Sequence, residues 1–341
     1  MIYNKAQVQI IILFRKSDYI IMEQKRLGNT GLTVSEFCLG VLPMGPLQAN
    51  LEPEKCQLLI RRAAELGVTF FDTAEVYKTQ SYIGNALEGL SDKCVIATKS
   101  SAATYDDMAR AFEKALCELK RDIIEVFHMH AAKANTDIFS IRKGALDFLH
   151  KAKRQNLIKA VGISTHDVRV ARLAAENDEI DVLYPIINKA GLGIVNGTLE
   201  QMLEVIKIAG KNGKGVYAMK VLGGGSLIKQ IDQSINWVRA VEDIHAISIG
   251  VVSENELLHN LKIFGVSGIA EANPIPIRQK RLYISFFCKN CGICIDECPN
   301  FALSAGEKKV LVDHGKCLLC GYCTPRCPEF AIRVVWHKFR A

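Results

Sequence analysis

The stretch VTFFDTAEVY, residues 68–77, shows the pattern that decides the fold: a short apolar run that ends in polar and charged side chains. Runs of this kind recur along the chain with longer amphipathic stretches between them, a pattern typical of buried parallel strands that alternate with helices. The predicted strands span residues 37–41, 68–72, 95–99, 126–130, 160–164, 181–187, 216–220 and 246–250. The predicted helices span residues 52–66, 107–119, 138–154, 168–177, 199–212 and 254–263.

About eight strand–helix units in roughly 240 residues predict a closed (β/α)8 TIM barrel, with a doubly wound open sheet as the competing fold. The barrel is expected to span residues 22–264. We expect a connecting segment over residues 265–281, a small α+β domain over residues 282–335 and a tail over residues 336–341. Residues 1–21 are interpreted as an N-terminal extension, with a misplaced start codon as the favoured explanation and a short genuine extension as the alternative.

Composition and charge exclude several classes of protein. Hydrophobic residues make up 49% and charged residues 23% of the 341 residues, the balance of a globular protein with a large core. The formal net charge of +7 is modest and no Lys/Arg-rich run is interleaved with aromatics, so no nucleic-acid partner is expected. The apolar run at residues 8–14 is far shorter than the ~20 residues that span a bilayer, and no secretory cleavage site follows it. We therefore expect a cytoplasmic protein without a membrane span.

Eight of the twelve cysteines lie in an internal repeat. Its copies are CKNCGICIDECPN at residues 288–300 and CLLCGYCTPRCPE at residues 317–329, each with the spacing C-x2-C-x2-C-x3-C-P. Three thiolates from one tight loop can surround part of a [4Fe–4S] cluster, and the fourth cysteine of each copy ligates the other cluster. The spacing thus predicts one cluster on Cys288, Cys291, Cys294 and Cys327 and a second cluster on Cys317, Cys320, Cys323 and Cys298.

Zinc and disulfides are the alternatives for these cysteines. Zinc favours paired CxxC motifs and would leave the third cysteine of each triplet unused. Over about residues 282–335 the sequence resembles the bacterial-type two-cluster ferredoxin domain. The remaining cysteines are expected to be small buried hydrophobic residues rather than ligands: Cys38, Cys56, Cys94 and Cys117.

Four polar side chains are predicted to meet at one rim of the barrel. Asp72, Lys99 and His130 end three successive predicted strands, and the carboxyl ends of barrel strands form the active site. Tyr77 follows shortly after Asp72 and can lean in from the loop. A buried lysine beside a tyrosine lowers the pKa of the phenol, and the phenol can protonate a carbonyl oxygen as hydride reaches the carbon. His128, on the same strand face as His130, is expected to pack in the core rather than to bind zinc.

These motifs resemble those of the aldo-keto reductases and occur in that family's order. The resemblance begins at RLGNTGLTVS (26–35) and ends at GVVSENELLHNL (250–261). Between them it includes FDTAEVY (71–77), ATK (97–99), VGIS (161–164) and AMKVLGGGSL (218–227). The resemblance implies that Tyr77 is the general acid/base, Lys99 tunes its pKa, Asp72 anchors Lys99 and His130 orients the substrate carbonyl.

The resemblance also implies a nicotinamide cofactor, although several positions differ from the family. The family holds the carboxamide with a Ser-Asn pair and a Gln and stacks an aromatic side chain on the ring. Here Ser164 is followed by Thr165, Tyr184 replaces the Gln, and Met219 replaces the aromatic residue. Glu256 replaces an Arg that often contacts the adenosine phosphate, so NADH is expected at least as readily as NADPH.

The expected dinucleotide contacts follow from the same comparison. Residues 223–225 also follow a strand and precede a helix, a position where backbone N–H groups can cradle a phosphate. The full set is Ser164, Asn188, Met219, Lys220, Gly223, Gly224, Gly225, Ser253 and Asn260.

The leading prediction is an oxidoreductase that interconverts a small carbonyl and an alcohol with nicotinamide, and that uses its iron–sulfur clusters for electron transfer. Nicotinamide passes two electrons as hydride whereas each cluster passes one, so direct exchange needs a splitter such as a flavin, which either binds in this chain or is supplied by an electron-transfer protein partner. An electron-transfer subunit with a barrel that serves only for docking is the alternative. A catalytic barrel with purely structural clusters is a third hypothesis.

Overall fold

The computed structural model describes residues 22–90, 93–132, 134–269 and 280–336. The interpretation of residues 1–21 lies outside the described residues, as do most of the expected connecting segment and most of the expected tail.

Eight parallel strands close into a barrel in the order β10-β3-β4-β5-β6-β7-β8-β9. The closed ring confirms the predicted TIM barrel and rules out the open sheet. The strands are β3 (Phe37–Gly40), β4 (Phe70–Asp72), β5 (Val95–Ser100), β6 (Ile124–Ala131), β7 (Ile158–Thr165), β8 (Val182–Pro185), β9 (Gly215–Ala218) and β10 (Ala246–Ile249).

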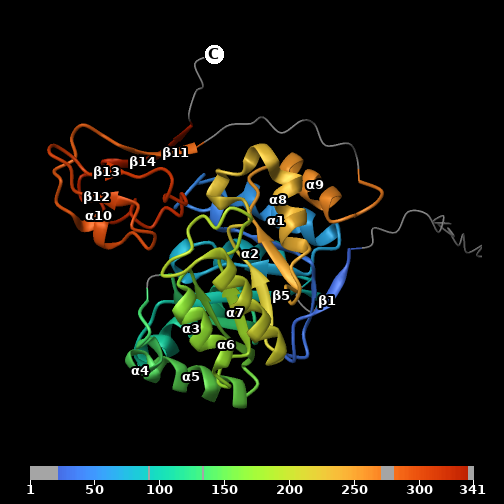
Figure 1. The fold of residues 1–341 in the computed structure, drawn as a ribbon. Helices are drawn as coiled ribbons and strands as arrows, with labels where there is room; N and C mark the ends of the chain where they lie inside the picture. Colours follow the sequence, from blue (N-terminus) through green and yellow to red (C-terminus); the bar gives the residue numbers. More distant parts are fainter. Residues whose placement is uncertain (1–21, 91–92, 133, 270–279, 337–341) are drawn as a thin grey trace, which may run out of the picture.

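Helices surround the barrel in Figure 1, and most coincide with the predicted amphipathic stretches. The predicted helix over residues 138–154 is two helices that meet at Arg142. The sequence-based prediction also omitted α2 and α8. The helices are α1 (Pro53–Glu65), α2 (Gln80–Ala86), α3 (Tyr105–Leu119), α4 (Ile138–Ile141), α5 (Lys143–Arg154), α6 (Val168–Glu176), α7 (Leu199–Lys211), α8 (Ile231–Arg239) and α9 (Glu254–Ile263).

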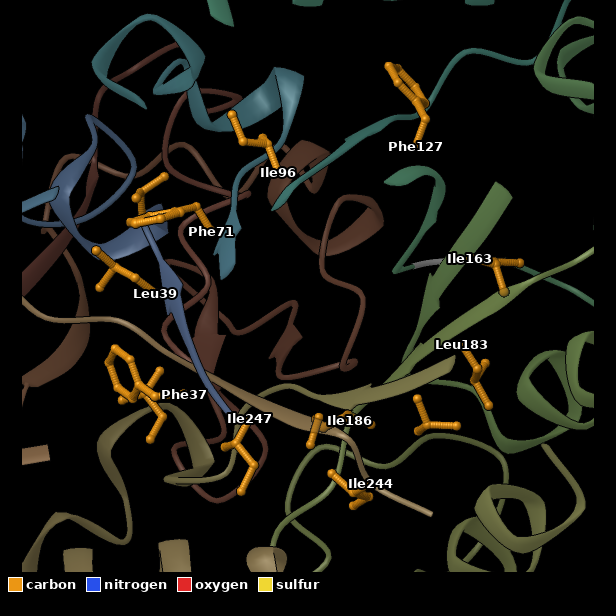
Figure 2. Packing of buried hydrophobic residues seen from close by; sticks show 14 of the residues in the cluster. Phe37, Leu39, Phe71, Ile96, Phe127, Ile163, Leu183, Ile186, Ile244 and Ile247 are labelled. Atoms are coloured by element: carbon orange, nitrogen blue, oxygen red, sulfur yellow. The ribbon is translucent and has the colours of Figure 1, made fainter. Parts of the chain in front are cut away.

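Side chains along each barrel strand alternate between the helices and the barrel interior, as the two-residue period of a strand requires. Figure 2 shows apolar side chains that leave the ring of strands towards the helices, among them Phe71 and Phe127. Phe70 and Val126 belong instead to a separate cluster inside the barrel. Polar residues at the interior positions near the carboxyl ends of the strands therefore face a common space.

The other end of the barrel is closed by an antiparallel hairpin of β1 (Gln24–Arg26) and β2 (Thr33–Ser35). Leu27 and Val34 of this hairpin are fully buried in the interior cluster. Access to the interior is therefore expected only from the carboxyl ends of the strands.

The C-terminal unit, orange to red in Figure 1, packs against the barrel as a small α+β domain. It pairs β11 (Lys280–Ile284) with β14 (Ile332–Trp336), and β12 (Leu303–Ser304) with β13 (Leu311–Val312), around the short helix α10 (Ile293–Asp296). Its core is a cluster of apolar residues and cysteines, separate from the barrel core.

Of the cysteines outside the repeat, Cys38, Cys56 and Cys94 are buried as expected, but Cys117 is exposed. The expectation of burial was wrong for Cys117 because it lies on α3 opposite the face that buries Phe112, Ala115 and Leu119. Among the described helices, none is long and apolar enough to cross a membrane.

Candidate active site

The four polar residues of the predicted rim lie at the carboxyl ends of neighbouring strands. Asp72 ends β4, Lys99 lies in β5, His130 lies in β6, and Tyr77 lies in the short 3-10 helix η2 (Glu75–Tyr77). Lys99 is 1% exposed, and its Nζ donates to both carboxylate oxygens of Asp72 at 2.7 Å and to the Thr73 carbonyl at 2.5 Å. The ammonium group thus has three acceptors and is almost fully buried.

Two tyrosines that sequence reasoning did not assign to the site complete the surroundings of Asp72. Tyr217 donates to Asp72 Oδ1 at 2.9 Å, and Tyr184 donates to Asp72 Oδ2 at 3.4 Å. Their rings stack with centroids 3.9 Å apart. Tyr184, at the position of the family's carboxamide-binding Gln, is therefore directed towards the ion pair.

Burial dominates the protonation of this site. It raises the pKa of Asp72 against the opposing charge of Lys99, and it lowers the pKa of Lys99 against the opposing charge of Asp72. Burial also raises the pKa of Tyr77 well above its usual value, whereas the sequence-based expectation was that Lys99 lowers it. Burial, followed by the charge of Lys99, lowers the pKa of His130 so that its ring is neutral.

Tyr322, from the second copy of the cysteine repeat, enters the same site. Its hydroxyl lies 2.9 Å from His130 Nε2, and the Tyr322 and Tyr77 phenols are close enough that each shifts the pKa of the other. Its ring packs with Leu42, Leu47 and Tyr77 in a small apolar cluster. A single phenol oxygen therefore occupies the point on which the side chains of Tyr77 and His130 converge.

The space that remains over these residues is a pocket of about 20 Å3. A volume of roughly 10–15 Å3 suffices for one water molecule, whereas ligand pockets measure about 300–1,000 Å3. The pocket therefore admits about one water molecule while the C-terminal domain is in place. Its lining is Leu42, Tyr77, Lys99, His130, Ala132, Ser164, His166, Met219, Lys220, Cys320 and Tyr322.

The residues expected to hold the nicotinamide ring fit that role only in part. Ser164, Met219 and Lys220 line the pocket, and Ser164 Oγ is a buried polar atom without a hydrogen-bond partner in the described part of the chain, as a carboxamide contact requires. Asn188 is buried and already bonded: its Nδ2 donates to Leu192 O at 2.9 Å, and its Oδ1 accepts from Leu192 N at 2.9 Å. The Asn188 side-chain amide therefore stabilises the loop that contains Leu192 and is not free to bind the nicotinamide.

The expected phosphate turn is covered. Gly223–Gly225 form the 3-10 helix η4, and Gly224 has φ +67°, a left-handed conformation that favours glycine. A Cβ atom at Gly224 would lie 2.3 Å from the carbonyl oxygen of Leu318, so the backbone of the cysteine repeat lies directly on this turn. A dinucleotide therefore does not fit this mouth while the C-terminal domain is docked.

Asp72, Tyr77, Lys99 and His130 are here called the tetrad. The remaining expected contacts lie on or beside α9, away from the pocket at the tetrad. Ser253 caps α9, its Oγ accepting from Glu256 N at 3.3 Å, and Asn260 is buried on the same helix. Glu256 accepts from Val252 N at 2.8 Å, which favours a carboxylate at this helix N-terminus.

The eight repeat cysteines gather as the spacing predicts. Burial, together with the nearby thiols of Cys288, Cys291 and Cys327, raises the pKa of the Cys294 thiol to about 11. In the second copy, burial raises the pKa of the Cys317 thiol to about 11. Two nearby thiols add to this rise, that of Cys320 and that of Cys298 from the first copy. The fourth cysteine of each copy thus lies with the triplet of the other.

Backbone amides also point at three of these sulfurs, and one of these amides is Asn290 N, which donates to Cys288 Sγ at 3.4 Å. Ala302 N donates to Cys298 Sγ at 3.3 Å, and Ala331 N donates to Cys327 Sγ at 3.2 Å, at equivalent positions of the two copies. Such hydrogen bonds stabilise thiolates and tune cluster potentials, and cysteines with this spacing are the ligands that [4Fe–4S] clusters require. Among the described residues, no group of three or more His, Cys, Asp or Glu side chains is arranged to hold a single metal ion.

Two further buried side chains support the rim. His128 is fully buried with Nε2 2.8 Å from the Tyr217 hydroxyl, so it packs inside the barrel below the tetrad. Arg142, which sequence reasoning missed, donates to His130 O and to Ser100 O, both at 3.0 Å, and to Ala102 O at 2.9 Å. It binds carbonyls at and just beyond the carboxyl ends of β5 and β6, from the point in the chain where α4 ends and α5 begins.

Comparison with known families agrees with this geometry. The profile of the aldo/keto reductase family matches residues 36–263, and the profile of the 4Fe-4S dicluster domain matches residues 287–331.

Characterised relatives are similar at low identity. L-galactose dehydrogenase of Arabidopsis thaliana is 23% identical over 221 residues, which cover 61% of this chain and 68% of that protein. Methylglyoxal reductase DkgA of Escherichia coli (strain K12) is 28% identical over 194 residues, which cover 53% of this chain and 67% of that protein.

Solved structures share the fold. A putative aldo-keto reductase from Pseudomonas aeruginosa superimposes with a TM-score of 0.62 at 24% identity, covering 74% of this chain and 98% of that one. An aldo-keto reductase from Bacillus halodurans superimposes with a TM-score of 0.61 at 17% identity, covering 73% of this chain and 93% of that one. The matched family profile, the closed barrel and the dicluster match together show that the chain belongs to the aldo/keto reductase family and carries a 4Fe-4S dicluster domain in its C-terminal part.

Proposed function

We propose that the protein is an oxidoreductase that interconverts a small carbonyl compound and the corresponding alcohol at Tyr77, Lys99, Asp72 and His130. The observation that carries the proposal is the convergence of Tyr77 and His130 on one oxygen atom, the Tyr322 hydroxyl, 2.9 Å from His130 Nε2. A carbonyl oxygen at that point would accept hydrogen bonds from both side chains.

Each residue has a distinct part in this proposal. The raised pKa of Tyr77 keeps its hydroxyl protonated near neutral pH, so it can transfer a proton to the carbonyl oxygen. Neutral His130 orients the carbonyl. The buried Lys99–Asp72 pair supplies a fixed positive charge near the phenol, with Lys99 Nζ 5.2 Å from the centre of the Tyr77 ring. This charge favours the negative charge that develops on the oxygen atoms during proton transfer.

The proposal includes a source of electrons for the carbonyl. Dependence on NADH or NADPH follows from the family resemblance, and a bound nicotinamide would supply hydride. The predicted clusters pass single electrons, so a protein electron carrier is the expected partner of the dicluster domain, with a flavin as the splitter where nicotinamide takes part. A cytoplasmic location likewise stays a prediction.

The direct test is turnover by anaerobically purified, fully loaded protein. A panel of small aldehydes, ketones and alcohols is offered with NADH, with NADPH, or with a dithionite-reduced viologen, and the organic products are measured by chromatography. Conversion of a carbonyl to its alcohol with any of these donors, lost in a Tyr77→Phe variant, supports the proposal. Absence of conversion with all three donors contradicts it.

An electron-transfer protein with the barrel as a docking platform is the second candidate, and the entry of Tyr322 into the active site favours it. It predicts clusters that dithionite reduces reversibly in protein that converts none of the carbonyls. The turnover assay therefore separates the two candidates.

Replacement of His130 by glutamine is expected to raise KM for the carbonyl and to lower kcat by about 10-fold or more, because a misplaced carbonyl loses much of its reactivity. The ring contacts of His130 with Tyr77 and Tyr322 would be lost as well. Steady-state kinetics with the preferred donor provide the measurement. Unchanged KM and kcat would show that His130 does not touch the substrate.

Replacement of Glu256 by arginine is expected to shift binding towards NADPH, since a carboxylate repels a 2′-phosphate and a guanidinium binds it. The ratio of the NADPH and NADH dissociation constants is the measurement. Because Glu256 accepts from Val252 N, thermal unfolding of the variant must be followed in parallel. An unchanged ratio would remove Glu256 from the cofactor site.

A further inference from the structure

The segment Leu318–Tyr322 of the second cysteine repeat, here the docking loop, lies in the mouth of the barrel. We propose that the docking loop is an internal competitor for the barrel's ligands. Tyr322 takes the place of the substrate oxygen, and Leu318 covers the turn expected to bind phosphate. Docking of the dicluster domain and binding of a dinucleotide therefore exclude each other. This inference rests on the proposed function.

Tyr322 binds the tetrad as a substrate would. Its hydroxyl meets both Tyr77 and His130, with 2.9 Å to His130 Nε2. Its ring lies edge-on to the His130 ring, with centroids 5.8 Å apart, and fills the apolar side of the pocket beside Leu47. A carbonyl substrate requires the same two hydrogen bonds and the same space.

Leu318 lies in the sequence of the dicluster domain but packs against residues of the barrel. It is 3% exposed and lies within the main hydrophobic core of the barrel. Its carbonyl lies against Gly224 so closely that a Cβ atom there would approach to 2.3 Å, and its side chain packs on Gly193. The pyrophosphate of a dinucleotide at Gly223–Gly225 would overlap with Leu318.

Specific contacts on both sides of the mouth hold the loop in place. Asn300 of the dicluster domain donates to Gly193 O at 2.8 Å, and its Oδ1 lies 3.2 Å from His166 Nδ1. Gly321, at φ +82°, approaches Leu47 so closely that a Cβ atom on Gly321 would lie 2.3 Å from the carbonyl oxygen of Leu47. Hydrogen bonds and close backbone approaches of this kind require one defined arrangement of the two domains.

The first copy of the repeat also contacts the barrel, through Asn300, but it lacks the leucine and the tyrosine that enter the mouth. At the positions of Leu318 and Tyr322 it has Lys289 and Ile293, and Ile293 is 44% exposed. The apolar leucine and the hydroxyl-bearing tyrosine are thus peculiar to the copy that faces the barrel.

A docked state of this kind lowers the apparent affinity for a competing ligand by the fraction of molecules that are undocked. A substitution in the docking loop that weakens docking must therefore tighten dinucleotide binding, although it changes none of the residues expected to bind the dinucleotide. Removing part of a side chain usually weakens ligand binding or leaves it unchanged. Tighter binding is expected only if the docking loop and the dinucleotide compete for the same space.

The test measures binding of NADH and NADPH by anaerobic calorimetry to iron-loaded protein, with Leu318→Ala, Tyr322→Phe and the matched control Leu311→Ala. Leu311 is 53% exposed on β13, so its truncation leaves the docking loop intact. Loss of buried leucine packing in Leu318→Ala is expected to tighten binding by about tenfold or more, and loss of one hydrogen bond in Tyr322→Phe by about two- to tenfold. Leu311→Ala is expected to bind as the wild type does.

Hydrogen exchange supplies a second readout that does not depend on turnover. Saturating NADPH is expected to increase amide exchange across residues 317–324, because the dinucleotide displaces the loop. Equal affinities in all four proteins, or binding by none of them, would overturn the proposal, as would slower exchange of the loop with NADPH bound. Turnover that persists while these binding results fail would remove the competition and leave the proposed function intact.

Discussion

Tyr77→Phe is expected to lower the rate of carbonyl conversion by about 10²–10⁴-fold, the usual contribution of a positioned general acid. The substitution removes one oxygen atom and keeps the ring, which is 7% exposed and packs with Leu47 and Ala74. The free energy of unfolding should therefore change by no more than about 1.5 kcal/mol, the range of a single hydrogen bond. A large loss of rate without a comparable loss of stability identifies a chemical role.

The matched control is Tyr105→Phe. Tyr105 begins α3, packs on Phe148 with ring centroids 5.4 Å apart, and does not line the tetrad pocket. Product formation is measured at saturating substrate for both variants. A Tyr77→Phe protein that converts carbonyls within threefold of the wild type would assign the proton to another donor.

Asp72→Asn is expected to destabilise the barrel by about 3–5 kcal/mol, because it leaves the buried ammonium of Lys99 without its counter-charge. Lys99 and Asp72 have side chains that are 1% and 4% exposed, and the two Nζ–carboxylate distances are both 2.7 Å. Tyr217 would lose a charged acceptor at the same time. Denaturant unfolding followed by far-UV circular dichroism measures the loss.

Asp147→Asn provides the comparison for an exposed pair. Lys143 and Asp147 are 2.8 Å apart, but their side chains are 70% and 49% exposed. Breaking such a pair is expected to cost about 0–1 kcal/mol, since water screens it. Equal effects of the two substitutions would mean that water reaches Lys99 in solution and that the Lys99–Asp72 ion pair is not buried.

The barrel and its tetrad could be predicted because both follow from local pattern. Apolar runs ending in Asp72, Lys99 and His130 mark strands and their carboxyl ends, and in a closed barrel those ends share one rim. Cysteine spacing likewise indicated the crossed grouping of Cys298 and Cys327, since a short loop cannot surround a cluster by itself.

The missed features depend on contacts between distant segments. Tyr184 and Tyr217 occupy interior strand positions, which the two-residue alternation could have shown, but their bonds to Asp72 depend on how far each strand extends. The burial of Arg142 depends on two carbonyls in β5 and β6 and one just beyond β5. Tyr322 lies some 190 positions from His130, and only its difference from Ile293 in the first repeat hinted at a separate role.

The strict inside–outside alternation of the barrel strands limits how this protein can change in length. A single inserted or deleted residue within β5 would exchange Lys99 with its neighbour, moving the charge among the helices and an outer residue into the interior. The packing of the core and the chemistry proposed for Lys99 would both be lost, so we expect length variation to be confined to loops and to appended segments. An added module could therefore reach the four tetrad residues only from the rim, which is where the dicluster domain meets them.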